Sequence, residues 1–167
     1  MNKNQLEISE KIIEFVKEIT YPITAEKLIY IRNKMYSRIV IRHYDDTTME
    51  HEKSIRWKRT SAQILSDEYV YNGKSCTDLT VLFLAFCKVL NLETRFVKLK
   101  KEKFVHSVAE IKLEDDWYMF DISNKNNLPV KGKITDKNHY KDWRLWKKGR
   151  DSWDLDLTSF QSIEKIR

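Results

Sequence analysis

The chain is poor in the residues that usually mark turns, linkers and crosslinks. It has three glycines, two prolines and two cysteines among its 167 residues, so it has no glycine- or proline-rich linker and gives only soft signals for where its elements end. If Cys76 and Cys87 lie on one helix, ~16 Å of rise separates them, which is too far for a disulfide or a shared zinc ion. We expect Cys87, which lies in an apolar run, to be a small core residue.

Long apolar runs are also missing. The longest, Leu79 to Leu90, is interrupted by Lys88 and is too short to span a bilayer, and residues 1–5 do not begin an apolar signal core. We therefore expect a cytoplasmic protein with no membrane partner. A composition of 41% hydrophobic and 34% charged residues is typical of a folded globular protein, and the length fits a single domain over residues 1–167.

The net charge of +6 raises the question of an anionic partner. The basic clusters at residues 56–59 and 98–103 are short and lie within helix or strand patterns, and the tryptophans do not alternate with Lys or Arg as in single-strand binding surfaces. The sequence therefore favours a solvated lysine-rich surface over a nucleic-acid partner. It leaves open a preference for acidic substrates.

The N-terminal part predicts helices. Apolar residues at helical spacing indicate a helix over about residues 5–19 and a second one that begins after Thr24, a suitable N-cap. The polar residues 43–54 predict a loop, and residues 55–65 predict a third helix.

The centre of the chain predicts a buried helix. Residues 69–71 lead through the turn dipeptide Asn72-Gly73 to a segment from Cys76 to Leu90 that is apolar nearly all round, as in a helix at the centre of a domain. Asn91 is well placed to end it in the left-handed conformation.

After this helix the apolar period changes from helical to alternating, which predicts strands over residues 95–100, 104–113 and 117–122. Glu114 to Asp116 form a polar hairpin turn. Helices followed by strands predict an α+β fold in which N-terminal helices precede a central buried helix packed on an antiparallel β-sheet.

The hairpin can be tested for register. If Leu113 faces Asp116, one face of the two strands is wholly apolar; its residues are Ala109, Ile111, Leu113, Tyr118, Phe120 and Ile122. Asp121 then lies opposite Val108 and diagonal to His106, ~7–8 Å away along the backbone, so that the two side chains can meet. A three-residue loop would instead place the side chains of Asp121 and His106 on opposite faces of the hairpin.

Cys76, His106 and Asp121 together suggest acyl-transfer chemistry. A helix start stabilises a thiolate through its free N–H groups and positive dipole end, and a nearby imidazolium lowers the thiol pKa further. An aspartate orients and stabilises that imidazolium. Each residue alone also fits an ordinary role: an inert thiol, a strand histidine, and a turn or capping residue. Their joint placement favours the chemical interpretation.

Four segments carry a resemblance to a known family: Gly73-Lys74-Ser75-Cys76-Thr77-Asp78, Leu90-Asn91-Leu92-Glu93-Thr94-Arg95-Phe96-Val97, His106-Ser107-Val108-Ala109-Glu110-Ile111 and Trp117-Tyr118-Met119-Phe120-Asp121-Ile122-Ser123. As a set they resemble the transglutaminase-like (papain-like) cysteine superfamily. The chain departs from the family pattern in three places: one extra residue stands between Gly73 and Cys76, Asn91 replaces a glycine, and Val108 replaces a frequent aromatic residue.

The resemblance spans about residues 55–125, with residues 1–54 as a helical lead-in and residues 126–167 as a tryptophan-rich C-terminal part. It implies a cysteine helix packed on an antiparallel sheet and a catalytic triad of Cys76, His106 and Asp121. It does not place a side-chain oxyanion donor, for which Gln63, Tyr69 and Tyr71 are candidates.

The expected function is that of a thiol-dependent acyl-transfer enzyme, a peptidase or amidase that hydrolyses amide bonds of a peptide or protein substrate through a thioester. The alternatives are a protein-glutamine transglutaminase-type crosslinker, and a non-catalytic module that holds a peptide between Trp117 and the tryptophans at 143, 146 and 153. No cofactor or metal is expected, and no calcium-loop spacing is present. The oligomeric state stays open.

Overall fold

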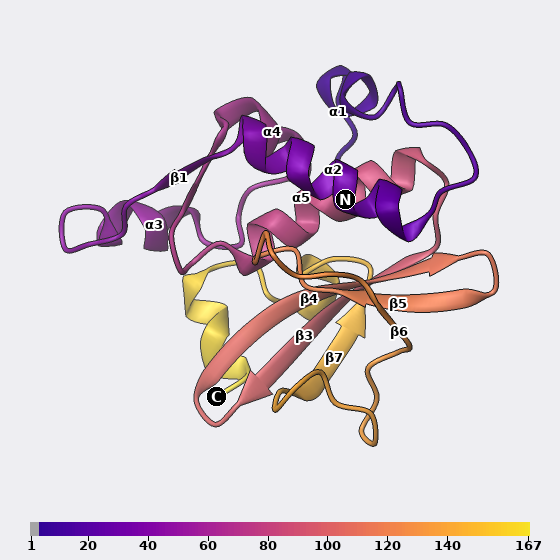
Figure 1. The fold of residues 1–167 in the computed structure, drawn as a ribbon. Coiled ribbons are helices and arrows are strands. Elements are labelled where there is room, and N and C mark those ends of the chain that lie inside the picture. Colours follow the sequence, from indigo (N-terminus) through magenta and orange to yellow (C-terminus); the bar gives the residue numbers. More distant parts are fainter. Residues whose placement is uncertain (1–3) are drawn as a thin grey trace.

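The computed structural model describes residues 4–167 and has two layers, a group of helices and an antiparallel β-sheet (Figure 1). Residues 1–3, part of the N-terminal stretch without a signal core, lie outside this range. In the view of Figure 1 the helices within residues 10–89 lie above the sheet, the yellow helix near the C-terminus lies beside it, and the orange segment that precedes β7 (Arg144–Gly149) lies below it. The predicted α+β architecture is therefore confirmed.

Six elements precede the central helix: α1 (Glu10–Phe15), α2 (Ala25–Arg38), β1 (Val40–Arg42), α3 (Met49–Ile55), α4 (Ser61–Asp67) and β2 (Tyr69–Tyr71). Thr24 caps α2 with its side chain, as predicted. The predicted helix over 5–19 is wrong in length, because Gln5 is tied to distant parts of the chain. Its side-chain Oε1 accepts hydrogen bonds from the N–H and hydroxyl of Ser152 at 3.0 and 2.7 Å, and α1 begins only after Ser9 caps it.

The predicted loop over 43–54 and helix over 55–65 are also corrected, because two short helices, α3 and α4, occupy this stretch. The polar segment folds as α3 with Glu52 buried and ion-paired to Arg56 one turn later, at 2.6 Å. The expected single helix is divided because Thr60 caps α4 and starts a new helix there.

The central helix α5 (Cys76–Val89) begins at the predicted cysteine. Every residue from 77 to 87 is buried, which agrees with its apolar character on all sides. Asn91 has a φ of 57°, so it occupies the left-handed region as expected. Before the helix, β1 and β2 pair in parallel and lead the chain through Asn72 and Gly73 to Cys76.

The sheet has the order β6-β5-β4-β3-β7, with all pairings antiparallel. Its other strands are β3 (Thr94–Lys101), β4 (Phe104–Leu113), β5 (Asp116–Phe120) and β6 (Val130–Lys131). The three central strands lie where the sequence predicts them, whereas β6 and β7 come from the C-terminal third, for which no strand was predicted. The predicted hairpin register is confirmed, because Leu113 pairs with Asp116 and Lys112 with Trp117.

Both faces of the sheet carry a core. The predicted apolar face, with Ala109, Ile111 and Phe120 fully buried, belongs to one cluster with α5 and the N-terminal helices. The opposite face forms a smaller cluster of Val97, Leu99, Val108, Met119, Ile134 and Tyr140. The C-terminal third therefore covers a second face that the hairpin alone would leave exposed. No helix among residues 4–167 is both long and apolar enough to cross a bilayer.

Candidate active site

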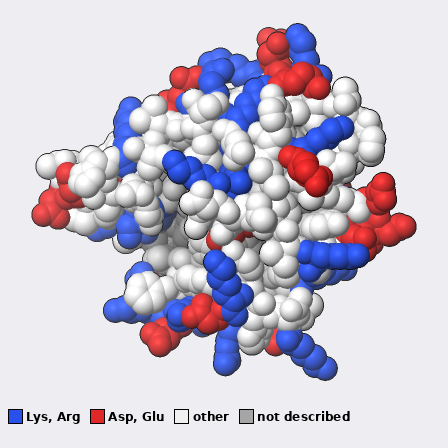
Figure 2. Space-filling view, viewed as in Figure 1, with Lys and Arg blue, Asp and Glu red and all other residues white. Residues whose placement is uncertain are grey.

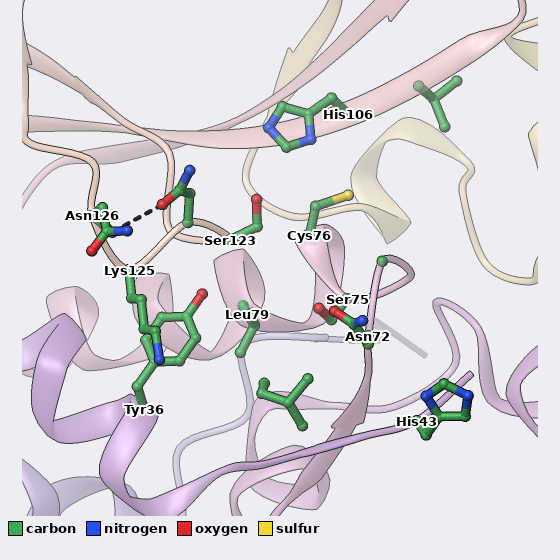
Figure 3. Close-up of a pocket in the computed structure, with 14 residues that line it drawn as sticks. Tyr36, His43, Asn72, Ser75, Cys76, Leu79, His106, Ser123, Lys125 and Asn126 are labelled. Carbon is green, nitrogen blue, oxygen red and sulfur yellow. Dashed lines mark hydrogen bonds between the residues drawn. The ribbon is translucent and has the colours of Figure 1, made fainter.

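Cys76 is the first residue of α5 and lies in the wall of a pocket (Figure 3). The first N–H groups of a helix have no carbonyl partner within it, and the side chain of Ser75, the N-cap residue, does not bind them. These groups and the positive end of the helix dipole favour an anion at Cys76. Cys76 is partly exposed and Cys87 is buried, and both are free thiols.

His106 and Asp121 are brought together by the β4–β5 pairing. Oδ2 of Asp121 lies 2.8 Å from Nε2 of His106, and its Oδ1 accepts hydrogen bonds from the N–H and the hydroxyl of Ser123 at 3.2 and 2.8 Å. Tyr140 donates a further hydrogen bond to Oδ2 at 3.3 Å. Because Nε2 is engaged by Asp121, Nδ1 is the ring nitrogen left to exchange a proton with Cys76, which lies next to His106 in Figure 3.

Trp143 also belongs to this cluster, and its ring stacks on the His106 ring with centroids 5.2 Å apart. The sequence suggested the C-terminal tryptophans only as one side of a peptide-binding cleft, without assigning this contact. Trp146 packs against the main core, and Nε1 of Trp153 donates to the carbonyl of Trp57 at 2.6 Å. Trp117 is not part of this cluster, and the cationic groups of Arg95 and Lys133 lie over its ring.

The thiol and the imidazole shift each other's pKa. Burial raises the pKa of Cys76, but the interaction with the His106 side chain and the positive charge of Lys98 outweigh burial and lower it to about 6. Burial lowers the pKa of His106, but the hydrogen bond with Asp121 and the interaction with Cys76 raise it to about 10. At neutral pH the pair is therefore a thiolate and an imidazolium. In Asp121 the pKa is lowered, because the contacts with His106 and Ser123 outweigh burial.

The pocket has a volume of about 770 Å³ and opens to solvent beside Cys76. It lies between β4 and the segment after β5 on one side and β1 and the turn before α5 on the other (Figure 3). Its lining is mostly polar or small; the residues are Tyr36, Ile41, His43, Asn72, Gly73, Ser75, Cys76, Leu79, Val105, His106, Ser123, Asn124, Lys125 and Asn126. An extended chain can therefore approach the thiolate from solvent.

None of the three expected oxyanion donors lines this pocket. Gln63 uses its side chain in the capping box of α4, Tyr69 packs against Arg42, and the hydroxyl of Tyr71 hydrogen-bonds with Nδ1 of a histidine at 2.7 Å. Asn72 does line the pocket, with Cys76. The sequence analysis treated Asn72 only as a turn residue. Its side-chain amide, four positions before Cys76, could have been named there as a further candidate oxyanion donor.

Asp78 fixes the start of α5. Its Oδ2 accepts a hydrogen bond from the Arg59 guanidinium at 2.7 Å, with both side chains buried, and Arg59 also donates to the carbonyl of Tyr69 at 3.1 Å. The helix start is therefore anchored to β2, the strand that leads into it. This acidic position after the cysteine has a structural role in the chain.

Other ligand classes find less support in the described structure. Within residues 4–167, no three His, Cys, Asp or Glu side chains gather closely enough to hold a metal ion. Figure 2 shows Lys and Arg side chains scattered over the visible face, with acidic side chains among them. The excess positive charge is therefore not concentrated in one patch on that face.

Comparison with known proteins bears on the fold. No family model matches the chain, and no curated protein matches it. Among solved structures, it is similar to the crystal structure of a "putative cysteine protease" from Cytophaga hutchinsonii, with a TM-score of 0.58 and 14% sequence identity. The two proteins share a fold. The match covers 92% of this chain and 48% of the other, so the chain spans about half the length of that neighbour.

Proposed function

We propose that the protein is a thiol-dependent hydrolase of transglutaminase-like type that cleaves amide bonds of a peptide or protein with Cys76, His106 and Asp121. The observation that carries this proposal is the His106–Asp121 pair, with Nε2 and Oδ2 2.8 Å apart, next to a thiol at a helix start in the wall of an open pocket. The description of the structural neighbour as a cysteine protease supports the same class of chemistry.

In the first half of the reaction the Cys76 thiolate attacks the carbonyl carbon of the substrate. A C–S bond forms, and the carbonyl electron pair moves onto oxygen to give a tetrahedral oxyanion. As this intermediate collapses, the C–N bond breaks and His106 gives its proton to the leaving amine. The product is an acyl thioester on Cys76 and a neutral imidazole.

In the second half, water replaces the amine. His106 takes a proton from the water as it attacks the thioester carbonyl, and the C–S bond then breaks to release a carboxylic acid and the thiolate. The imidazolium is thereby restored. Asp121 holds the imidazole ring in one orientation and stabilises its charged form through both halves.

The oxyanion needs hydrogen-bond donors, and the walls of this pocket offer two sources. One is the first-turn N–H groups of α5, which the Ser75 side chain leaves free. The other is the side-chain amide of Asn72, which lines the same pocket. Asn72 therefore takes the place of the tyrosine and glutamine candidates that the sequence suggested.

The test is the pH profile of iodoacetamide alkylation at Cys76, in the wild type and in His106→Ala. Cys87 is an internal control, because burial alone raises its pKa. We expect Cys76 to titrate well below ~8.5, the ordinary value for a thiol, and to titrate higher in His106→Ala. An unshifted Cys76 in the folded wild type would contradict the proposal and favour a peptide-binding module.

A second experiment separates hydrolysis from crosslinking. The protein is incubated with a panel of peptides, with and without a primary amine, and Cys76→Ser provides the inactive control. Hydrolysis gives new carboxyl termini whether or not amine is present. A product that incorporates the amine and leaves the peptide backbone intact would instead indicate a transglutaminase-type reaction.

A further inference from the structure

A lysine is buried behind the candidate site. Lys98 lies on β3 and has no exposed surface, so its ammonium group cannot reach bulk water. Its Nζ donates to Oγ of Ser107 at 3.0 Å and to Oγ1 of Thr77 at 3.2 Å. It also lies over the ring of Trp57, 4.3 Å from the centroid.

This ammonium group has no carboxylate partner. Within residues 4–167, no Asp or Glu oxygen forms an ion pair with Nζ of Lys98, whereas the buried Arg59 is paired with Asp78 at 2.7 Å. A buried charge without a counter-ion is strongly unfavourable. The Cys76 thiolate is the candidate counter-ion, because Lys98 binds the hydroxyl of Thr77, the residue that directly follows Cys76.

The charged surroundings of Lys98 agree with this assignment. Burial lowers its pKa to about 8, while the Cys76 thiolate raises it and the Arg56 guanidinium, which is itself paired with Glu52, lowers it. Lys98 in turn lowers the pKa of Cys76. Lys98 is thus largely charged at neutral pH, and the negative charge of the Cys76 thiolate stabilises this charged form.

The hydrogen bonds of Lys98 also fix geometry. Thr77 directly follows Cys76 in the sequence, and Ser107 directly follows His106; their hydroxyls lie 2.9 Å apart. Lys98 binds both hydroxyls, so it joins the start of α5 to β4 at the residues next to the thiol and the imidazole. A shift of either element would break these contacts.

We propose that Lys98 is a positioning residue of the thiol site, a buried countercharge to the Cys76 thiolate that also locks the cysteine helix to the histidine strand. This inference rests on the function proposed above. His106 loses its charge when it protonates the leaving amine, whereas Lys98 transfers no proton in the proposed cycle. Lys98 therefore also makes the thiolate a better leaving group when the thioester is hydrolysed.

The main test compares Lys98→Met with Lys147→Met. Methionine is similar in length to lysine, uncharged and unable to donate. Lys147 pairs opposite Lys98 in the sheet but is exposed, so its variant removes the same charge without touching the site. The thiolate absorbance of Cys76 is followed against pH, with Cys76→Ser as the blank.

We expect the pKa of Cys76 to rise by about 1 or more in Lys98→Met and to stay unchanged in Lys147→Met. A low pKa that is the same in the wild type and in Lys98→Met would overturn the role of Lys98 and leave the proposed function standing. An ordinary Cys76 pKa in the wild type would overturn both.

A second measurement keeps the proposal testable if Lys98→Met does not fold. In His106→Ala the imidazolium is gone and Lys98 remains, so the pKa of Cys76 should stay below that of Cys87, which burial raises and no cation lowers. A Cys76 pKa as high as that of Cys87 would contradict the role of Lys98. If Lys98→Met does fold, Ser107→Ala is a further control, because it removes one anchoring hydroxyl and no charge. It should slow acylation while it shifts the thiol pKa less than Lys98→Met does, and an equal or larger shift would contradict the countercharge role.

Discussion

Replacing Asp121 by asparagine removes one negative charge and changes the size of the side chain little. Burial lowers the pKa of His106, and the carboxylate 2.8 Å from its Nε2 is the main opposing influence that raises it to about 10. An opposite charge at this range moves a pKa by about 1 to 3, which corresponds to ~1.4–4 kcal/mol. We therefore expect the pKa of His106 to fall to between about 7 and 9 in Asp121→Asn.

The assay is NMR of histidine ring carbons against pH. The chain has four histidines, and the His106 signal is the one missing from His106→Ala. Asp115→Asn, at the exposed tip of the β4–β5 hairpin, is the matched control and should leave the titration unchanged. A wild-type His106 that titrates near 6.5, or a raised value that persists in Asp121→Asn, would refute the reasoning.

The raised pKa of His106 also makes the free energy of unfolding depend on pH. Because the folded pKa of His106 is raised, its stabilising contribution is complete below ~6.5, the unfolded value, and is lost as the pH rises through about 10. In Asp121→Asn the folded pKa is lower, so the contribution should be smaller and its loss should be complete at a lower pH. Urea unfolding between pH 7 and 10 measures the difference.

Three further predictions concern other contacts. Asn72→Ala should slow acylation by an activated ester about 10²–10³-fold while iodoacetamide alkylation, which forms no oxyanion, keeps its rate. Trp143→Ala should lower the free energy of unfolding by at least about 0.5–1.5 kcal/mol in urea titrations, because the stack on His106 is lost. Asp78→Asn leaves the buried Arg59 guanidinium paired only with the more exposed Asp67, at 3.2 Å, and should lower the free energy of unfolding by about 1.5–3 kcal/mol in the same titrations, the usual contribution of a hydrogen bond to a charged group.

Matched variants control these effects. For Asn72→Ala, equal slowing of acylation and alkylation would point to a misplaced Cys76 and contradict an oxyanion role. Trp117→Ala removes a tryptophan outside the pocket and should leave the titration of His106 unchanged, whereas Trp143→Ala should alter it. If Asp78→Asn lowers the free energy of unfolding no more than the exposed Asp115→Asn does, the buried Arg59–Asp78 pair contributes little to stability.

The central part of the fold was predictable because its signals are local. The alternating pattern of β4 and β5, with a two-residue polar turn, allows one register that buries a complete apolar face, and this register puts Asp121 beside His106. The helix at Cys76 follows from a turn dipeptide and an apolar run that ends at Asn91. In each case neighbouring residues in the sequence decide the structure.

The parts that sequence reasoning missed depend on distant residues. Residues 5–9 have helical spacing, but Gln5 binds Ser152 near the other end of the chain, and this contact overrides local propensity. Trp143 stacks on His106 only because β7 returns to the sheet beside β3. Lys98 looks like one charge in a basic cluster, and only the packed fold shows that it is buried.

The two thiols have opposite dependence on folding. Cys87 is inaccessible in the folded protein, so it should react only after unfolding. Cys76 is a thiolate only while α5 and β4 stay together, so at neutral pH it should react faster in the folded chain than in the unfolded one. In a single labelling reaction read by mass spectrometry, fast labelling at Cys76 would therefore report folded molecules, and labelling at Cys87 would report unfolded ones.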